Sequence, residues 1–352
     1  MTTMTSDEFA QRVFHSALGA IETLSIHLGD RLGWYRALAG GGPATPAELV
    51  ARAGGAERYA REWLEQQASY GILEHEPGSG RFSLPKGAAE VLTDEGSLNY
   101  LAPLARMIAA SGAQMPALVE AYRSGGGVSW SRFGEDMRMS QADMNRPWFE
   151  RALPGAFASV PDLDALLRRP GAKVADVGCG AGWSSIALAR AYPGLTVDGV
   201  DLDAPSVALA TRNAGTAGLA ERVRFHHRDA AALTSGEYDA VFAFECLHDM
   251  PRPVDTLSAA RRAVRHDGMV VVMDEAVGES FTAPGDETER LMYGFSLLVC
   301  LPDGLAHQPS AGTGTVMRPA TLRRYAEQAG YTGVEILPIE DFGFWRFYRL
   351  HH

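Results

Sequence analysis

From residue 172 onward, short apolar runs rich in β-branched residues alternate with stretches of helical spacing. The five runs are AKVADVG, LTVDGVDL, VRFHHRD, YDAVFAF and GMVVVMDE. This alternation is typical of β-α-β units, in which helices cover both faces of a mostly parallel sheet. We therefore predict an α/β, Rossmann-like doubly wound sheet over residues 169–352, which ends with a helix near 319–329 and two further strands.

The first hundred residues show a different pattern. Apolar positions recur at helical spacing over residues 5–40, with a break near Gly29; Thr45 then starts a short helix, and a further helix covers about 56–70. The runs ILEHE and RFSL flank the turn PGSG and predict a hairpin. Three short helices and a hairpin resemble a winged-helix module, and we interpret residues 1–100 as a mostly helical, winged-helix-like dimerisation domain.

Residues 101–168 lie between these two patterns. Two helical stretches, 97–121 and 139–168, flank the glycine-rich and aromatic segment SGGGVSWSRFG. We interpret 101–168 as a helical linker that helps to form the substrate pocket, with Trp148 and Phe149 as candidate substrate contacts. Plain packing is the commoner explanation for aromatic residues at such a junction.

The charge of the chain argues against a nucleic-acid partner. The formal net charge is -11, whereas nucleic-acid binding depends on Lys and Arg that neutralise phosphates. Residues 1–100 hold about 13 acidic and about 8 basic side chains, the reverse of a DNA-binding face. In the expected recognition helix, Arg58 and Arg61 alternate with glutamates. We expect the winged-helix-like module to bind a second copy of the chain, forming a homodimer.

The cysteines and the N-terminus favour the cytoplasm. Cys179, Cys246 and Cys300 are scattered and show neither the spacing of a zinc site nor that of a disulfide framework. The N-terminus lacks the basic flank and apolar core of a signal peptide, and no apolar run is long enough to span a bilayer. We therefore expect a cytoplasmic protein without a membrane partner.

A glycine-rich turn follows the first strand of the predicted sheet, in the string DVGCGAG. Glycines at a strand-to-helix turn allow positive φ and a close backbone approach to a ligand. A dinucleotide-binding turn has glycine at the sixth position of GxGxxG, where this chain has Trp183. The turn therefore predicts a cofactor site but fits NAD poorly.

The string DVGCGAG resembles the first motif of class I methyltransferases that use S-adenosylmethionine (SAM), and the resemblance extends over about 172–274. It implies that the turn faces the methionine end of SAM, at positions that match Asp176, Gly178, Gly180 and Gly182. SAM is thus the expected cofactor.

Two further acidic residues end the next strands. Asp201 lies about 20 residues past the turn, where a carboxylate can accept both ribose hydroxyl protons; the alternative role of helix cap suits Asp203 better. The family resemblance implies that Asp229 binds the adenine amino group. Phe244, at the end of the fourth strand, is a further candidate cofactor contact.

The fourth strand leads into Glu245-Cys246-Leu247-His248-Asp249-Met250. The LHD sequence resembles small-molecule O-methyltransferases with a winged-helix dimerisation domain, which implies that His248 deprotonates a substrate hydroxyl. A carboxylate on its other ring nitrogen would raise its basicity, and Asp274 or Glu275 is placed to reach it. His248 as mere pocket lining is the equal alternative, and Asp249 is a candidate cap for the next helix.

The segment 286–318 contains a helix followed by a glycine-rich loop that is long enough to form a lid or a pocket wall. Its candidate apolar substrate contacts are Met292, Phe295 and Met317, although the helical spacing of Met292 and Phe295 also fits a core position. The plant-type members of the family carry an Asn and a basic cluster in this loop, where this chain has GTGT.

We therefore predict a SAM-dependent methyltransferase that acts on a small molecule, with a hydroxyl of an aromatic compound or secondary metabolite as the expected acceptor. Because the loop has GTGT in place of the Asn and basic cluster of the plant-type members, methylation of a nitrogen or carbon atom remains an alternative. A SAM-responsive winged-helix transcriptional regulator is the alternative from another class. A metal-assisted reaction is a minority interpretation, since no HxxE or HxH pair supports a site, and we expect no metal.

Overall fold

The computed structural model describes residues 4–352, which divide into two compact units between Gly112 and Ala113. We expected three segments, with divisions near 100 and 168; the structure instead assigns the start of the middle segment to the first unit and the rest to the second. No helix among the described residues is long and apolar enough to cross a membrane.

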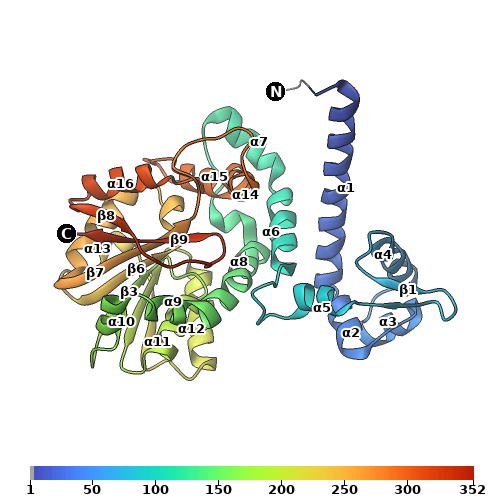
Figure 1. Ribbon diagram of the computed structural model, residues 1–352, viewed down its shortest axis with the longest axis horizontal. Helices are drawn as coiled ribbons and strands as arrows, with labels where there is room; N and C mark the ends of the chain where they lie inside the picture. Colours follow the sequence, from blue (N-terminus) through green and yellow to red (C-terminus); the bar gives the residue numbers. More distant parts are fainter. Residues whose placement is uncertain (1–3) are drawn as a thin grey trace. The chain divides into compact units, whose positions relative to one another are not determined.

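The first unit is mostly helical (Figure 1). Its elements are α1 (Ser6–Arg31), α2 (Trp34–Gly41), α3 (Pro46–Ala53), α4 (Glu57–Ser69), β1 (Glu74–Glu76), β2 (Arg81–Ser83), α5 (Lys86–Thr93) and α6 (Ala102–Ala113). The predicted cap of α3 is confirmed: the Thr45 side chain accepts from Glu48 N, and the Glu48 carboxylate accepts from Thr45 N. The predicted break after the first helix falls slightly later than Gly29, at Leu32 and Gly33.

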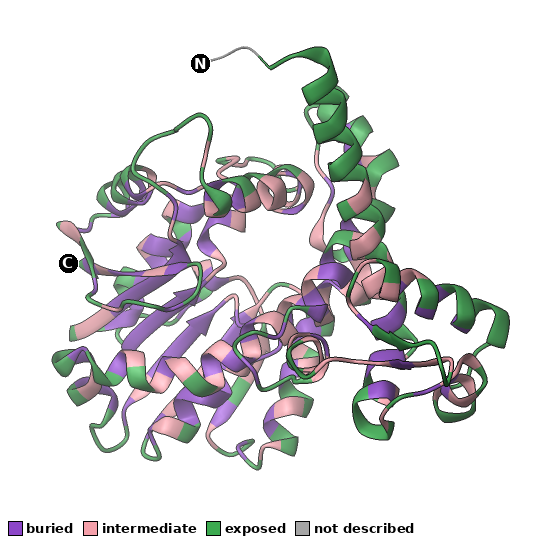
Figure 2. Ribbon diagram, turned by 45° about the vertical axis from the view of Figure 1, so that its right-hand side comes forward, coloured by how far each residue is buried: buried purple, intermediate pink, exposed green. Residues whose placement is uncertain are grey.

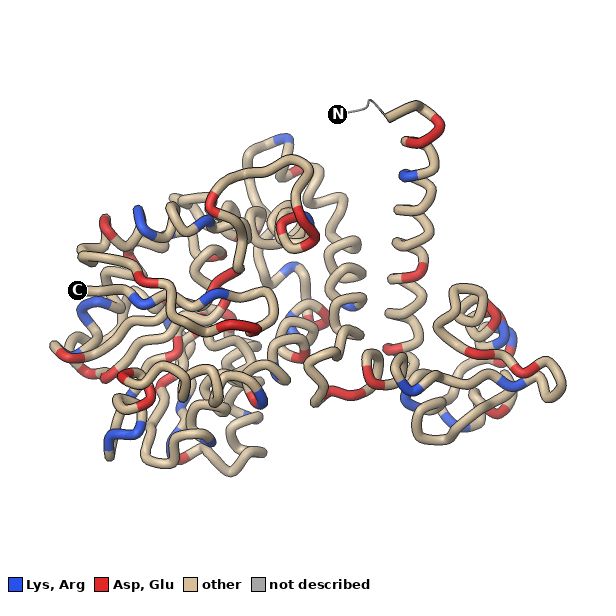
Figure 3. Tube along the Cα trace, viewed as in Figure 1, with Lys and Arg blue, Asp and Glu red and all other residues tan. Residues whose placement is uncertain are grey.

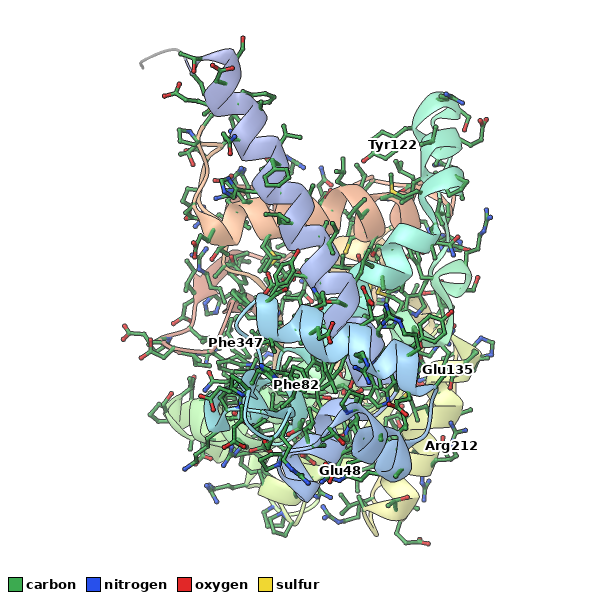
Figure 4. The ribbon with its side chains drawn as sticks, turned by 90° about the vertical axis from the view of Figure 1, so that its right-hand side faces the viewer. Glu48, Phe82, Tyr122, Glu135, Arg212 and Phe347 are labelled. Carbon is green, nitrogen blue, oxygen red and sulfur yellow. The ribbon has the colours of Figure 1, made fainter. Side chains whose placement is uncertain are left out.

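The core of the first unit is aromatic. Trp63 packs edge-on against Trp34 and Tyr35, with ring centroids 5.1 Å and 5.0 Å away, and Leu49 and Leu64 complete the buried cluster. The hairpin of β1 and β2 is antiparallel, and Ala44 bridges to Phe82 of β2. Figure 4 labels Phe82 in this hairpin. The predicted winged-helix arrangement of helices and hairpin is therefore present.

The second unit is built on one seven-stranded sheet in the order β5-β4-β3-β6-β7-β9-β8. The strands are β3 (Lys173–Val177), β4 (Thr196–Asp201), β5 (Val223–His227), β6 (Tyr238–Phe244), β7 (Val264–Glu275), β8 (Gly333–Ile336) and β9 (Trp345–His351). The first five are parallel, and β9 and β8 add antiparallel pairs at one side. Parallel strands place their carboxyl ends at one edge of the sheet, where doubly wound folds bind ligands.

Helices cover both faces of this sheet, as the alternation predicts. The helices and turns of the second unit are α7 (Met115–Ser124), α8 (Trp130–Pro147), the π-helix η1 (Trp148–Ala152), α9 (Leu153–Ala158), α10 (Pro161–Leu167), α11 (Trp183–Ala191), α12 (Ala204–Thr216), the 3-10 turns η2 (Ala230–Ala232) and η3 (Leu247–Asp249), α13 (Pro253–Ala263), α14 (Glu287–Phe295), the π-helix η4 (Ser296–Cys300), α15 (Leu301–Leu305) and α16 (Pro319–Gln328). One core cluster joins α9, α10 and α11 to the sheet, and a second joins α13 and α16 to it. Figure 2 shows the strands between these helices as buried.

The helices before the sheet differ from their predicted bounds. The stretch predicted as one helix over 97–121 is two helices, divided before Met115 and Pro116. Helix α8 begins at Trp130, inside the segment expected to be a linker, and Gly134 kinks it with a φ of 79°. The hydroxyl of Tyr122 on α7, labelled in Figure 4, donates to the Leu297 carbonyl at 2.9 Å.

Candidate active site

The glycine turn between β3 and α11 has the backbone that its sequence predicts. Gly178, Gly180 and Gly182 have φ values of 65°, 51° and 80°, a region that side-chain-bearing residues rarely adopt. A Cβ at Gly178 would lie 2.7 Å from Cβ of Cys246, and one at Gly182 would lie 2.4 Å from the Phe225 ring. A Cβ at Gly180 would meet nothing within 4 Å. Gly178 and Gly182 are thus required by packing, whereas Gly180 leaves its backbone open to a ligand.

Asp176, at the end of β3, is fully buried and holds this turn in place. The hydroxyls of Ser184 and Ser185, in the first turn of α11, both donate to its carboxylate at 2.6 Å. Burial raises the pKa of Asp176 to about 6, and its other oxygen has no partner. The structure therefore places Asp176 beneath the turn, where it joins the strand to the helix.

Asp201 ends β4 and faces the same turn. Its carboxylate accepts from Gly180 N at 2.9 Å and from Asp203 N at 2.8 Å, and burial raises its pKa. Asp203 caps α12 through Ser206, as predicted, and also pairs with Arg138 of α8. The carboxylate expected to bind ribose and the one open glycine are thus in direct contact.

Asp229 follows β5 and is more exposed. One oxygen accepts from Ala231 N at 2.9 Å and so caps η2, while the other lies 3.4 Å from the guanidinium of Arg252. Asp176, Asp201 and Asp229 therefore end three neighbouring strands at the carboxyl edge of the sheet.

Several residues expected to contact ligands lie in the core instead. Phe149 and Phe244 are each 6% exposed and pack against each other and against Phe157. Trp148 packs on Phe342 and Trp345. These contacts match the alternative explanation of plain packing, because rings enclosed by other rings keep little surface for a ligand.

The apolar candidates from 286–318 differ in how far they are buried. Met317 is 2% exposed and belongs to the core cluster under α13 and α16, and Met292 is 4% exposed. Phe295, at the end of α14, keeps part of its surface exposed. Of the three, Phe295 alone retains appreciable surface.

His248 lies in η3, just past the end of β6, and is 3% exposed. Its Nδ1 lies 2.9 Å from Oδ1 of Asp274, at the end of β7, and its Nε2 lies 3.3 Å from Asp249. Of the two carboxylates expected to reach the ring, Asp274 therefore forms the hydrogen bond. Asp249 faces His248 and does not cap the next helix, whose N-cap is Arg252. That prediction is wrong because α13 begins three residues later than a cap at Asp249 requires.

The two carboxylates determine the charge of His248. Burial lowers the pKa of His248, but the charges of Asp249 and Asp274 raise it more, so that its pKa lies well above the ordinary value. Carboxylates on both sides of an imidazole stabilise its protonated form. The two carboxylates therefore hold the ring of His248 in one orientation and stabilise the imidazolium, which is the form that His248 takes when it accepts a proton.

The sequence analysis did not single out Glu245, which immediately follows β6. Its φ of 53° is one of two positive values among the described non-glycine residues, and Gln141 and Asn145 of α8 donate to its carboxylate. Strained backbone of this kind is concentrated at functional sites. Burial raises the pKa values of both Glu245 and Glu275, which repel each other. An acidic residue directly after a buried strand was the only sequence signal for it.

Within residues 4–352, two groups of side chains lie close enough to hold a metal ion: His248 with Asp249 and Cys300, and His248 with Asp274 and Glu275. Both groups share His248, whose two ring nitrogens already face carboxylates. Hydrogen bonding therefore accounts for the contacts of His248, whereas Oε2 of Glu275 has no partner.

Comparison with known proteins assigns the two units separately. Residues 174–268 match the family described as a methyltransferase domain, and residues 20–94 match an Rv2258c-like winged HTH domain. The chain is 32% identical over 170 residues to a ubiquinone biosynthesis O-methyltransferase of Aromatoleum aromaticum, covering 47% of this chain and 67% of that protein. It is 30% identical over 149 residues to the 27-O-demethylrifamycin SV methyltransferase of Amycolatopsis mediterranei, covering 41% of this chain and 54% of the relative.

Solved structures show the same fold over the whole chain. The mitomycin 7-O-methyltransferase MmcR matches with a TM-score of 0.74 at 20% identity, over 99% of both chains. An O-methyltransferase family protein from Burkholderia thailandensis matches with a TM-score of 0.72 at 20% identity, also over 99% of both. The chain belongs to the class I SAM-dependent methyltransferases that carry an N-terminal winged-helix domain. The predicted fold and the predicted cofactor, SAM, are thereby confirmed.

Proposed function

We propose that this enzyme methylates a hydroxyl group of a small molecule, with His248 as the general base. The observation that carries this proposal is the bond from His248 Nδ1 to the buried Asp274, at the edge of the sheet that holds the glycine turn. Bound SAM supplies an electrophilic methyl group. A phenolic hydroxyl, with a pKa of about 10, gains nucleophilicity when a base takes its proton.

The chain's own residues would hold the cofactor and the proton. The open backbone of Gly180 and the carboxylate of Asp201 fit the adenosyl and methionine parts of SAM, with Gly178, Gly182 and Asp176 holding the turn and Asp229 near the adenine. Asp274 orients the ring of His248 and stabilises the imidazolium that forms when the hydroxyl proton is transferred. Positioning of the two reactants provides much of the remaining acceleration.

The substrate class is proposed from the relatives. Their names include enzymes of ubiquinone, rifamycin and mitomycin metabolism, so we propose an aromatic or secondary-metabolite acceptor. Phe295, with its exposed surface, is the favoured apolar contact among the candidates; Trp148, Met292 and Met317 remain candidates with less support, because Trp148 packs against other rings and both methionines are buried. Product analysis by mass spectrometry and NMR identifies the methylated atom, and methylation at nitrogen or carbon would assign His248 a different role.

His248→Ala tests the proposed base. We expect turnover of a hydroxyl substrate to fall by about 10² to 10⁴-fold, because the hydroxyl loses its proton acceptor. SAM affinity, measured by titration calorimetry, should stay close to that of the wild type, since His248 does not contact the glycine turn. Undiminished turnover would leave His248 as pocket lining.

Asp201→Ala tests the cofactor site. Loss of the carboxylate removes the ribose acceptor and the partner of Gly180 N, so we expect SAM affinity to fall by about 10-fold or more. The control is Asp255→Asn, an exposed side chain on α13. Unchanged SAM affinity in Asp201→Ala would place the cofactor elsewhere.

We also propose a cytoplasmic homodimer that does not bind nucleic acid. In α4, the helix expected to read DNA, Arg58 pairs with Glu62 and Arg61 with Glu57. Figure 3 shows acidic and basic residues together on this part of the chain. Guanidinium groups that are already paired offer phosphates little net charge, which supports the enzyme over the alternative of a transcriptional regulator.

A further inference from the structure

Glu245 and Glu275 form a second functional pair beside His248. Glu245 follows β6 and Glu275 ends β7, and these strands are neighbours in the sheet. A carboxylate oxygen of Glu275 lies within 4.8 Å of both a ring nitrogen of His248 and an oxygen of Asp274. The pair therefore lies at the same strand ends as the proposed base.

Only Glu245 has hydrogen-bond donors in place. Gln141 and Asn145, four residues apart on α8 and hence on one face of that helix, hold its carboxylate despite the strained backbone. The Glu275 side chain, in a residue 2% exposed, has Oε2 without any partner. The Oδ1 of Asn145 and the Oδ2 of Asp274 also lack partners. Two neighbouring buried carboxyl groups, those of Asp274 and Glu275, thus each keep an unpaired oxygen.

The cluster also lacks a cation. Glu245, Asp249, Asp274 and Glu275 supply four carboxyl groups, and within residues 4–352 no Lys or Arg lies at ion-pair distance from any of them. His248 is the single basic partner. Buried carboxyl groups are normally paired, because burial without a partner is costly. A ligand that donates hydrogen bonds and carries positive charge would pair with the carboxyl groups that have no basic partner.

We propose that Glu275 binds a protonated amine of the substrate and selects cationic over anionic acceptors. This inference rests on the proposed function, since it places the amine beside the hydroxyl that His248 deprotonates. Glu275 supplies the free acceptor oxygen, and Glu245, held by α8, adds a second buried carboxyl group whose charge acts on it. An acceptor with a carboxylate at the same place would face four carboxyl groups and be excluded.

The sulfonium of SAM carries a positive charge that would itself interact with these carboxyl groups. The test therefore uses the full chain loaded with S-adenosylhomocysteine, the product of SAM that lacks this charge. Three phenols of similar size differ in charge: tyramine, 4-ethylphenol and 4-hydroxyphenylacetate. Titration calorimetry at pH 7.5 should give tyramine a Kd about 10 to 100-fold lower than that of 4-hydroxyphenylacetate, with 4-ethylphenol between them. Equal affinities, tighter binding of the acid, or no binding of tyramine overturns the proposal.

Glu275→Gln keeps the shape of the side chain and removes the carboxyl group that can release its proton when a cation binds. We expect it to reduce the preference for tyramine to about 3-fold or less, whereas Glu327→Gln, on the exposed surface of α16, should keep the wild-type ratio. A thermal melt and the affinity for S-adenosylhomocysteine establish that both variants are folded. An unchanged preference in Glu275→Gln, or a preference abolished by EDTA, overturns the proposal.

Methyl transfer is measured separately with the same three phenols and SAM. Product from tyramine supports both proposals. Tight tyramine binding that depends on Glu275, with no methylated phenol, would retain the amine site and reject the proposed hydroxyl acceptor. Methylation of all three phenols at equal kcat/KM would retain the proposed function and reject the amine site.

Discussion

At the scale of single residues, burial explains most of the electrostatics of this site. Asp176, Glu245, Glu275 and Asp303 all have raised pKa values, with loss of hydration as the largest cause in each. A carboxyl group that resists ionisation keeps a proton that the unfolded chain has already lost. The free energy of unfolding should therefore fall as the pH rises from the unfolded-state to the folded-state pKa of such a group.

Asp303→Asn tests this dependence. Burial, followed by the charge of Asp249, raises the pKa of Asp303 from 3.8 to about 7. Between these values the folded state alone keeps the proton, so the free energy of unfolding falls as the pH rises from about 4 to about 7. Asn carries no charge and keeps an acceptor for Trp130 N. We expect the variant to be more stable than the wild type by about 1 to 4 kcal/mol at pH 8.

Urea denaturation at pH 4 and pH 8 measures this difference. At pH 4 the advantage of Asp303→Asn should be largely lost, because the wild-type carboxyl is then protonated and uncharged in the folded state, while the unfolded state is close to the midpoint of its titration at 3.8. Glu327→Gln, on the exposed surface, is the control. The same stability difference at both pH values would contradict the assignment.

At the scale of elements, the site depends on the turns that follow parallel strands. The turn after β3 gives the open glycine, the end of β4 gives Asp201, and the ends of β6 and β7 give His248 and Asp274. These residues are far apart in sequence, and the parallel register of the strands brings them to one edge. The backbone conformation of the turn is therefore as important as its side chains.

Gly180→Ala tests the turn itself. The φ of 51° makes alanine unfavourable by about 1 kcal/mol or slightly more, while the new methyl group meets no protein atom within 4 Å. We expect a small loss of stability and a fall of about 10-fold or more in SAM affinity, because the methyl group enters the space left for the ligand. Gly215→Ala, in α12 with similar free space, is the control. Unchanged SAM affinity in Gly180→Ala would mean that this backbone does not face the cofactor.

At the scale of the whole molecule, α1 leaves a large apolar surface uncovered. Along its 26 residues only Gly29 and Asp30 are buried, and Figure 2 shows most of the helix as exposed. Its exposed apolar side chains, each more than 40% exposed, are Phe9, Val13, Phe14, Ile21, Leu24, Leu28 and Leu32. Several recur at helical spacing and form a stripe that no other described element of the first unit covers. A second copy of the chain is the occupant that we propose.

Leu24→Glu tests this dimer. A charge in the middle of the stripe should be excluded from an apolar interface, and we expect the mass measured by light scattering after gel filtration to fall from that of a dimer toward that of one chain. Gln11→Glu likewise introduces a glutamate, on an exposed position of α1 away from the stripe, and should leave the mass unchanged. A wild-type protein that is already monomeric would contradict the proposal.

The sequence by itself determined which segments form helices and which form strands of the sheet. The alternation of β-rich and helical runs and the glycine turn were sufficient to predict the sheet and a cofactor site, because local patterns report strands, turns and their sequence order. The resemblance of the motifs around Asp176, Asp229 and His248 to methyltransferases then implied SAM and the candidate base. The tertiary structure decided which side chains face one another. It packed Phe149 and Phe244 into the core, turned Asp249 toward His248, and paired Glu245 with α8 from 100 residues away. Contacts between distant segments depend on packing, which no local pattern records.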